Sequence, residues 1–317
     1  MYIPAVFRFI NKSLDQYVIR DVAARFQPPP VADCRIAQAG EYLRQEDYFC
    51  NFVQAAADLT FHDKHAFTFR SPMTTPAEAN NTVFGRLYRA GRKWQKRPSV
   101  ILLHGWNGER AYDWQFPWLA WRLNMSGINA AMIELPYHGR RKPQEKGAIR
   151  NFISSDLFHM VQAARQAMAD GRALLGWLAA QGSPQMGVLG FSMGGWLAGL
   201  MACHDARLDF CVLLSPLVNL DSAIKGLSFC EPVRQGLGGR NLQLNPLNLA
   251  SCKPLTALDK TLLVECRDDQ FIPVEDMEAV WRAWDKPVIW RVPHGHISVL
   301  MSWPVLERTM RWIARIV

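Results

Sequence analysis

Gly190-Phe191-Ser192-Met193-Gly194 is the stretch that decides the fold predicted for this chain. It follows a short apolar run at 186–189 and precedes a run of small and apolar residues at 195–200. This order predicts a strand, a sharp turn and a helix, and the flanking glycines let the backbone turn without a Cβ clash. A serine on such a turn points its hydroxyl over the end of a sheet, so Ser192 is the candidate nucleophile. A plain strand-to-helix turn with a capping serine is the alternative interpretation.

Two later junctions supply a candidate acid and a candidate base. Residues 261–266 predict a buried strand followed by Asp268-Asp269, and residues 288–292 predict the next strand followed by His294-Gly295-His296. Both junctions are expected to open at the same edge of a sheet. A serine hydroxyl is a weak nucleophile until an imidazole accepts its proton, and the imidazole needs a carboxylate to fix its tautomer. The order serine, acid, histidine along the chain therefore indicates serine chemistry.

With these motifs the chain resembles the α/β-hydrolase superfamily, in particular its serine esterase and lipase-like members. The resemblance runs from about residue 64 to the C-terminus. It rests on five motifs: Leu102-Leu103-His104-Gly105-Trp106, Pro136-Tyr137-His138-Gly139, the turn at 190–194, Asp269-Gln270-Phe271-Ile272-Pro273 and Gly295-His296. It implies a catalytic triad of Ser192, Asp269 and His296, and an oxyanion hole formed by the backbone N–H groups of Trp106 and Met193.

Each assignment has a competitor. The D-x-x-I-P spacing of the resemblance favours Asp269 as the acid and leaves Asp268 as a solvated turn residue. His294 rivals His296, but the small residue directly before His296 matches the family pattern. Asp221, beyond the predicted strand at 210–214, is a third possible acid, because some family members place the acid one strand earlier.

The other histidines and the cysteines are expected to have structural roles. His104 and His138 are expected to shape their loops by hydrogen bonding. The remaining histidines are interpreted as ordinary surface or core residues: His62, His65, His159 and His204. The seven cysteines show no C-x-x-C pair and no zinc-ligand spacing, so scattered reduced thiols are expected. We therefore expect no metal and no organic cofactor.

Composition is typical of a soluble enzyme. A chain of 317 residues that is 49% hydrophobic can bury a large core. Apolar runs fall short of the roughly 18 to 20 residues of a transmembrane span, and the N-terminal residues lack the pattern of a secretory signal, so we expect a cytoplasmic location. The net charge is +8, but the basic residues form only short groups and no nucleic-acid motif is found. The expected partner is a small-molecule ester or acyl compound; the oligomeric state is left open.

The alternation of strands and helices from Ser99 onward predicts an α/β-hydrolase fold, with a mainly parallel, doubly wound sheet. Its catalytic domain is expected at 64–317, with an antiparallel start at 66–69 and 82–87 and a last helix at 297–314. Residues 1–63 are expected to form an N-terminal helical extension packed on the body. Its helices are predicted at 3–22 and 41–59, the first from one apolar stripe with three-and-four spacing: Ile3, Phe7, Ile10, Leu14 and Tyr17.

Residues 219–260 form a long stretch between two predicted strands and are rich in Gly, Pro, Leu and Asn. Loops of this length are uncommon unless they are functional, so a lid-like insertion is expected. Five of its apolar side chains are candidates for lining an acyl or alcohol pocket: Ile224, Leu227, Phe229, Val233 and Leu237. A meandering surface segment anchored by these residues is the alternative.

The expected function is a serine hydrolase that cleaves carboxylic esters through an acyl-enzyme. Thioesterase, amidase or peptidase activity stays open, since the triad does not select the leaving group. A non-catalytic binding protein is another alternative. An interfacial lipid-associated protein is the last, because the apolar stripe at 3–17 has Arg8, Lys12 and Arg20 nearby.

Overall fold

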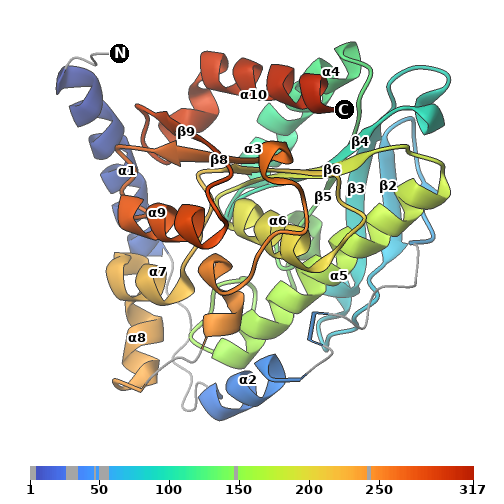
Figure 1. Cartoon of the computed structure of the whole chain (residues 1–317). Coiled ribbons are helices and arrows are strands. Elements are labelled where there is room, and N and C mark those ends of the chain that lie inside the picture. Colours follow the sequence, from blue (N-terminus) through green and yellow to red (C-terminus); the bar gives the residue numbers. More distant parts are fainter. Residues whose placement is uncertain (1–4, 26–34, 46–47, 50–56, 146–148, 241–243) are drawn as a thin grey trace.

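The computed structural model describes residues 5–25, 35–45, 48–49, 57–145, 149–240 and 244–317. Within these residues the chain builds one nine-stranded sheet in the order β1-β2-β3-β5-β4-β6-β7-β8-β9 (Figure 1). The strands are β1 Thr60–Phe61, β2 Ala66–Arg70, β3 Thr82–Tyr88, β4 Ser99–Leu103, β5 Asn129–Ile133, β6 Met186–Phe191, β7 Phe210–Leu214, β8 Thr261–Cys266 and β9 Val288–Val292.

The sheet changes from antiparallel to parallel across its width. β3 pairs antiparallel with β2 and β5, whereas every pairing from β5 through to β9 is parallel. The inner strands are apolar runs buried on both faces, as expected where helices cover both sides of a parallel sheet. The predicted mainly parallel sheet with an antiparallel start is confirmed.

Helices cover both faces of the sheet (Figure 1). Three helices pack on one face: α3 Glu109–Asp113, α4 Gln115–Met125 and α10 Trp303–Ile316. Four pack on the other: α2 Ile36–Leu43, α5 Leu157–Ala180, α6 Met193–His204 and α9 Val274–Ala283. Successive residues of a strand alternate between the two cores, as the pleat requires: Val100 and Leu102 lie in one, Ile101 and Leu103 in the other.

The helix predicted at 41–59 is confirmed only at 41–43, which form the end of α2, and is wrong at the other described residues. α2 ends at Leu43, and residues 44–45, 48–49 and 57–59 are not helical; 46–47 and 50–56 lie outside the described residues. Tertiary contacts hold the apolar residues instead. The Tyr48 hydroxyl donates to the carbonyl of Val161 in α5 at 2.7 Å, and the Phe49 ring stacks on His204 of α6 at 3.9 Å between centroids.

The predicted last helix at 297–314 begins later than expected. A short 3₁₀ turn, Ser298–Met301, comes first, and α10 then starts at Trp303 with Pro304 in its first turn, where proline is tolerated.

α1, Ala5–Arg25, agrees with the helix predicted at 3–22 but packs through a different face. Of the predicted apolar stripe, Phe7, Ile10 and Tyr17 are exposed by 60%, 52% and 67%. The buried face carries Asn11, Asp15 and Ile19, which are four residues apart.

The segment between β7 and β8 folds into short helices, α7 Leu220–Gly226 and α8 Glu231–Leu237, and several 3₁₀ turns. α1 packs against one of these turns, Ser228–Cys230, so the first helix and this segment lie together at one end of the sheet (Figure 1).

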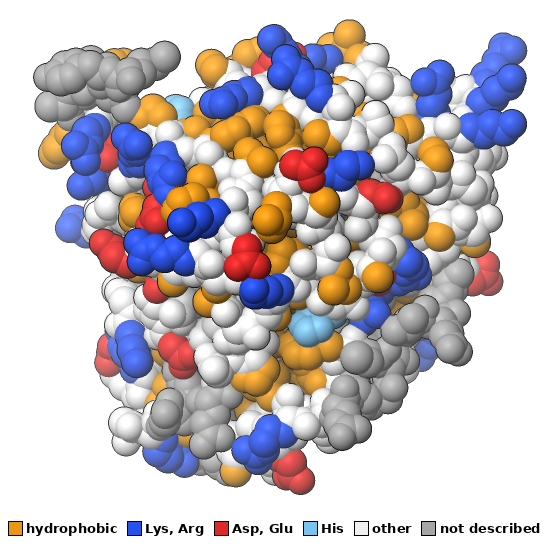
Figure 2. All heavy atoms as spheres, viewed as in Figure 1, with side chains coloured by type: hydrophobic (Ala, Val, Ile, Leu, Met, Phe, Trp, Pro, Cys, Tyr) orange, Lys and Arg blue, Asp and Glu red, His pale blue; other side chains and the backbone are white. Residues whose placement is uncertain are grey.

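Lys and Arg side chains are dispersed among acidic and apolar ones over the face seen in Figure 2. In the described residues, no helix combines the length and the hydropathy needed to cross a membrane.

Candidate active site

Ser192 stands on a sharp turn between β6 and α6, with φ 54° and ψ −120°. A non-glycine residue with positive φ is strained, and such strain is concentrated at functional sites. The turn is so tight that a Cβ at Gly190 would lie 2.0 Å from the carbonyl oxygen of Gly194, and one at Gly194 would lie 2.2 Å from that of Leu103. Both positions therefore require glycine, and Ser192 is held at the carboxyl end of β6.

A continuous hydrogen-bonded relay leads from Ser192 to Asp269 through His296. The Ser192 Oγ lies 2.8 Å from Nε2 of His296, and Nδ1 of His296 lies 2.8 Å from Oδ2 of Asp269. An ionised carboxylate can only accept, so Nδ1 carries the proton and Nε2 is left to accept from the serine hydroxyl. The side chains of His296 and Asp269 are 3% and 2% exposed, so the contact between these two is shielded from water.

Asp269 is fixed by hydrogen bonds to both of its oxygens. Oδ1 accepts from the backbone N–H groups of Phe271 at 2.7 Å and Ile272 at 2.9 Å, while Oδ2 also accepts from the Ser215 hydroxyl at 2.5 Å. No motif in the sequence points to Ser215. The available signal is its place directly after β7, at the same sheet edge as Ser192.

The surroundings of His296 set its pKa. Burial lowers the pKa, but the charge and hydrogen bond of Asp269, together with the charge of Asp15, outweigh burial and raise it above the ordinary 6.5. This environment stabilises the protonated, imidazolium form of the ring.

The competing acids lie elsewhere. Asp268 is 1% exposed; its carboxylate accepts from Nε of Arg8 at 3.0 Å and from Nδ2 of Asn11 at 3.3 Å. The expectation that Asp268 is a solvated turn residue is therefore wrong, because α1 covers it. Asp221, in α7, accepts from Asn248 at 2.9 Å.

His294, the competing base, is half-buried, and burial lowers its pKa. Its backbone carbonyl accepts from the N–H of Asp268 at 3.0 Å, which joins the histidine loop to the acid turn.

His104 and His138 shape their loops, as predicted. Nε2 of His104 accepts from the N–H of Leu135 at 3.0 Å, and Nε2 of His138 accepts from the N–H of Asn107 at 3.3 Å. Burial lowers the pKa of His104 to about 4 and that of His138 to about 3. Both rings therefore stay neutral near pH 7 and can act as acceptors.

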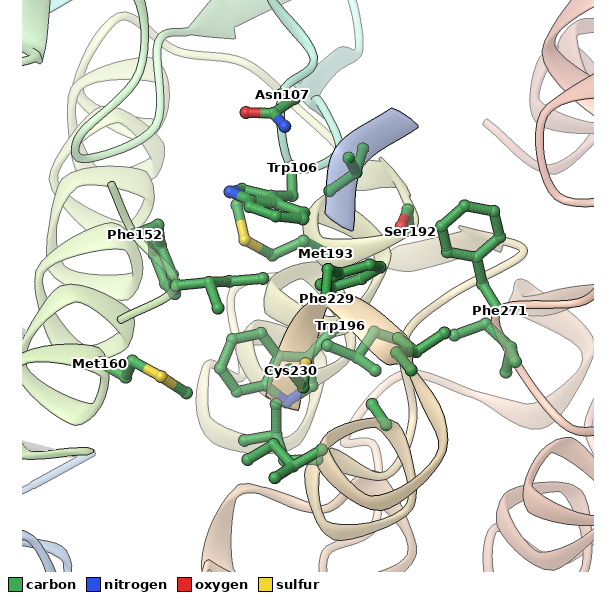
Figure 3. Close-up of a pocket in the computed structure, with 18 of the residues that line it drawn as sticks. Trp106, Asn107, Phe152, Met160, Ser192, Met193, Trp196, Phe229, Cys230 and Phe271 are labelled. Carbon is green, nitrogen blue, oxygen red and sulfur yellow. The ribbon is translucent and has the colours of Figure 1, made fainter. Parts of the chain in front are cut away.

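A cavity of about 220 Å³ opens at Ser192 (Figure 3). Its walls are predominantly apolar and include Trp106, Phe152, Met160, Trp196, Phe229 and Phe271. α1 contributes Val18 and Val22.

Three of the five side chains predicted to line a pocket do line this cavity: Ile224, Leu227 and Phe229. Val233 and Leu237 do not line it but are buried in the core beside it, so for these two the prediction is wrong. They lie in α8, one helix further along the chain than the residues that face the cavity.

Trp106 and Met193, the predicted oxyanion-hole residues, both border the cavity beside Ser192 (Figure 3). Met193 is the first residue of α6, and N–H groups in the first turn of a helix have no partner within the helix. The loop that carries Trp106 passes close to the serine, since a Cβ at Gly105 would lie 3.2 Å from that of Ser192.

Over the described ranges of the chain, no three His, Cys, Asp or Glu side chains gather in an arrangement that could hold a metal ion. The side chains that meet at Ser192 supply a hydroxyl, an imidazole and a carboxylate.

Comparison with known proteins identifies relatives. Residues 43–233 match the family model described as alpha/beta hydrolase domain containing 18. The uncharacterized protein Rv2627c of Mycobacterium tuberculosis is 28% identical over 290 residues, which cover 88% of this chain and 66% of that protein. The chain thus spans slightly less than two thirds of the length of this curated relative.

Several solved structures share the fold. Acetyl xylan esterase 1 from Thermoanaerobacterium sp. JW/SL YS485 has a TM-score of 0.61 at 14% identity, covering 94% of this chain and 98% of that one. Acetyl xylan esterase from Paenibacillus sp. R4 has a TM-score of 0.59 at 15% identity, with coverages of 88% and 98%. Esterase Pf2001 of Pyrococcus furiosus has a TM-score of 0.55 at 17% identity, with coverages of 82% and 93%. At these identities the similarity is one of fold.

Proposed function

Since the chain belongs to the alpha/beta hydrolase domain containing 18 family, we propose that it is a serine hydrolase that cleaves carboxylic esters through an acyl-enzyme. The observation that supports this proposal is the relay from Ser192 through His296 to Asp269, with 2.8 Å at each step, next to an apolar cavity. A nucleophile, a base in contact with it and a carboxylate behind the base are the groups that acyl transfer requires.

In the first half of the reaction, Ser192 Oγ attacks the carbonyl carbon of a bound ester. The hydroxyl proton passes to Nε2 of His296, and Asp269 stabilises the imidazolium through its bond to Nδ1. The carbonyl oxygen takes up the negative charge of the tetrahedral intermediate. When the intermediate collapses, the alcohol leaves with the proton from Nε2, and the acyl group stays on Ser192.

The backbone N–H groups of Trp106 and Met193 are the proposed donors to that oxyanion. Met193 directly follows the nucleophile, and Trp106 lies in the loop that packs against Ser192. Two preset donors cost no reorganisation when the charge develops, and loss of one such donor typically slows turnover by about 10²- to 10³-fold.

In the second half, a water molecule gives its proton to Nε2 of His296 and attacks the acyl carbonyl. The second tetrahedral intermediate collapses, His296 returns the proton to Ser192, and the carboxylic acid is released. Every proton that leaves an oxygen in this cycle is returned to another, so the three side chains are regenerated.

The apolar cavity is suited to binding a hydrophobic acyl or alcohol group of the substrate. Its walls offer few polar atoms beyond the catalytic groups, so affinity would come from apolar burial. The structural neighbours are two acetyl xylan esterases and an esterase, which favours an ester bond over an amide as the bond cleaved.

We further propose a domain organisation for the chain. Residues 64–317 are the catalytic domain, residues 219–260 its lid-like insertion and residues 1–63 an extension packed on the body. Two observations support this division. α1 and α7 both contribute side chains to the cavity walls, Val18 and Ile224 among them.

A fluorophosphonate probe tests the nucleophile without knowledge of the substrate, because the reagent requires only an activated serine and an oxyanion hole. We expect one covalent adduct, at Ser192 by peptide mass spectrometry, and a matching loss of p-nitrophenyl ester hydrolysis. Ser192→Ala abolishes labelling and His296→Ala slows it severely. His294→Ala, which removes the neighbouring imidazole instead, serves as the matched control and keeps the wild-type rate.

Two results would contradict the proposal. One is a folded wild-type protein that stays unlabelled while a hydrophobic fluorescent dye enters its cavity, which favours the binding-protein alternative. The other is faster cleavage of thioester or anilide analogues than of the matching oxygen ester.

A further inference from the structure

A buried carboxylate of the N-terminal helix binds both loops that carry the proposed acid and base. Asp15, in α1, is 0% exposed. Its Oδ2 accepts from the backbone N–H of His296 at 2.7 Å and of Gln270 at 3.1 Å, and its Oδ1 accepts from the N–H of Ile297 at 3.0 Å. One side chain from the start of the chain thus joins the acid turn to the histidine loop, more than 250 residues away in sequence.

Asn11, one helical turn earlier, holds the rest of the histidine loop. Its Nδ2 donates to the carbonyl of Pro293 at 3.1 Å, and its Oδ1 accepts from the Ser298 hydroxyl at 2.9 Å. The Ser298 oxygen in turn accepts from the N–H of Gly295 at 3.0 Å. The loop is therefore held by α1 on both sides of His296.

The loop lies directly on the helix. A Cβ at Gly295 would be 2.8 Å from Oδ2 of Asp15 and 3.0 Å from the carbonyl oxygen of Asn11. Glycine before His296 is required here because it lets the backbone reach the carboxylate.

The charge of Asp15 also acts on His296. A buried carboxylate costs free energy unless donors compensate it, and the three backbone N–H groups that bind Asp15 are such donors. Burial raises the pKa of Asp15 above its ordinary value, and the charge of Asp269 adds to the rise; the backbone hydrogen bonds and the His296 charge only partly offset it. The other titratable groups that face this carboxylate are Asp269 and, from the end of β8, Cys266; Asp268 sits nearby, paired with Arg8.

We propose that Asp15 is a positioning residue for His296, which makes α1 part of the working site. Asp15 fixes the backbone of His296 so that its ring spans Ser192 and Asp269, and its negative charge adds to that of Asp269 in stabilising the imidazolium. The expected effect of Asp15 on turnover rests on the proposed hydrolase function, whereas its expected effect on the pKa of His296 does not.

The test is Asp15→Asn, which keeps the shape of the side chain and removes the charge. Its amide nitrogen would face an N–H donor, so one of the three backbone bonds is lost. We expect kcat for a p-nitrophenyl ester to fall by about 10- to 100-fold with little change in KM, since misplacing a catalytic group affects the reaction step. The pKa of His296, followed by NMR of the imidazole during a pH titration, decreases, because a nearby negative charge has gone.

Asp21→Asn is the matched control on the same helix, since Asp21 is partly exposed and pairs with Arg25 one turn away. It should leave both readouts unchanged. If Asp15→Asn does not fold, Asn11→Ala takes its place: we expect a lower kcat with no change in the pKa of His296, because Asn11 holds the loop without charge.

The outcomes separate the two proposals. If the wild-type enzyme is active, and Asp15→Asn has the same kcat and the same His296 pKa as the wild type, the positioning role is overturned. A wild-type protein without activity or labelling overturns the hydrolase proposal. In that case the NMR titration still decides on Asp15: a decrease in the pKa of His296 supports the contact, and an unchanged value overturns it.

Discussion

The Ser215 hydroxyl donates a hydrogen bond of 2.5 Å to Oδ2 of Asp269. The same oxygen accepts from Nδ1 of His296 at 2.8 Å. Ser215 follows β7, which lies between the strands that precede Ser192 and Asp269. Ser215, Asp269 and His296 follow three neighbouring strands, β7, β8 and β9, and meet at one carboxylate, so the sheet itself orients the proposed acid.

Removing the Ser215 hydroxyl should slow the enzyme without unfolding it. A hydrogen bond to a charged group contributes about 1.5–3 kcal/mol, so Ser215→Ala is expected to lower kcat by about tenfold or more. The measurement is kcat with a p-nitrophenyl ester, together with the melting temperature. Ser222→Ala, in α7, is the control for loss of a hydroxyl; a Ser215→Ala enzyme as active as this control would show that the contact has no role in orienting Asp269.

The two adjacent aspartates should behave differently. Asp269→Asn is expected to lower turnover by about 10⁴-fold at a nearly unchanged melting temperature, because an amide favours the wrong imidazole tautomer; that figure is the one known for a serine protease. Asp268→Asn should affect stability more than turnover, since Asp268 is buried against Arg8 and Asn11. Kinetics and thermal melts of the two variants decide the matter. The reverse ranking would assign the acid role to Asp268.

The parts of the fold that could be predicted are those with local signals. The turn around Ser192 requires glycines at fixed spacing, and the apolar strands alternate with helices, so the parallel sheet and the edge at which Ser192, Asp269 and His296 meet follow from sequence. These signals come from residues close together in the sequence, and they do not depend on which other elements pack on the sheet.

The role of α1 could not be predicted in the same way. Its apolar stripe includes Phe7, Ile10 and Tyr17, which are exposed, whereas the contacts to the site are made by Asn11 and Asp15. Polar side chains that bind backbone groups far away in sequence leave no periodic pattern, and the partners become visible only in three dimensions. Tyr48 illustrates the same limit, because it lies in a turn and its hydrogen bond to α5 leaves no signal in the local sequence.

The pH dependence should follow His296. The base must be unprotonated to accept the serine proton, so kcat/KM rises with pH as His296 loses its proton. Burial lowers the pKa of His296, but Asp269 and Asp15 raise it by more than burial lowers it. The midpoint of the rise in kcat/KM is therefore expected above pH 6.5. In Asp269→Asn the residual activity should show a midpoint at lower pH, because the main charge that raises the pKa is gone. A profile of kcat/KM from about pH 5 to 9 measures both; a midpoint that does not move would show that another group governs the rise.

The cavity should set the preferred acyl length. Burying one methylene contributes about 0.8 kcal/mol, so kcat/KM for p-nitrophenyl esters is expected to rise about fourfold per methylene until the cavity of about 220 Å³ is filled, and then to fall. Ala223→Phe, which adds a ring to the wall, should move the optimum to shorter chains. Phe229→Ala, which removes one, should move it to longer chains. Trp121→Ala, on the exposed side of α4, is the control and should leave the profile in place. If both wall variants keep the wild-type optimum while their kcat values stay measurable, the acyl chain does not bind in this cavity, and the alcohol part of the ester becomes the group to vary.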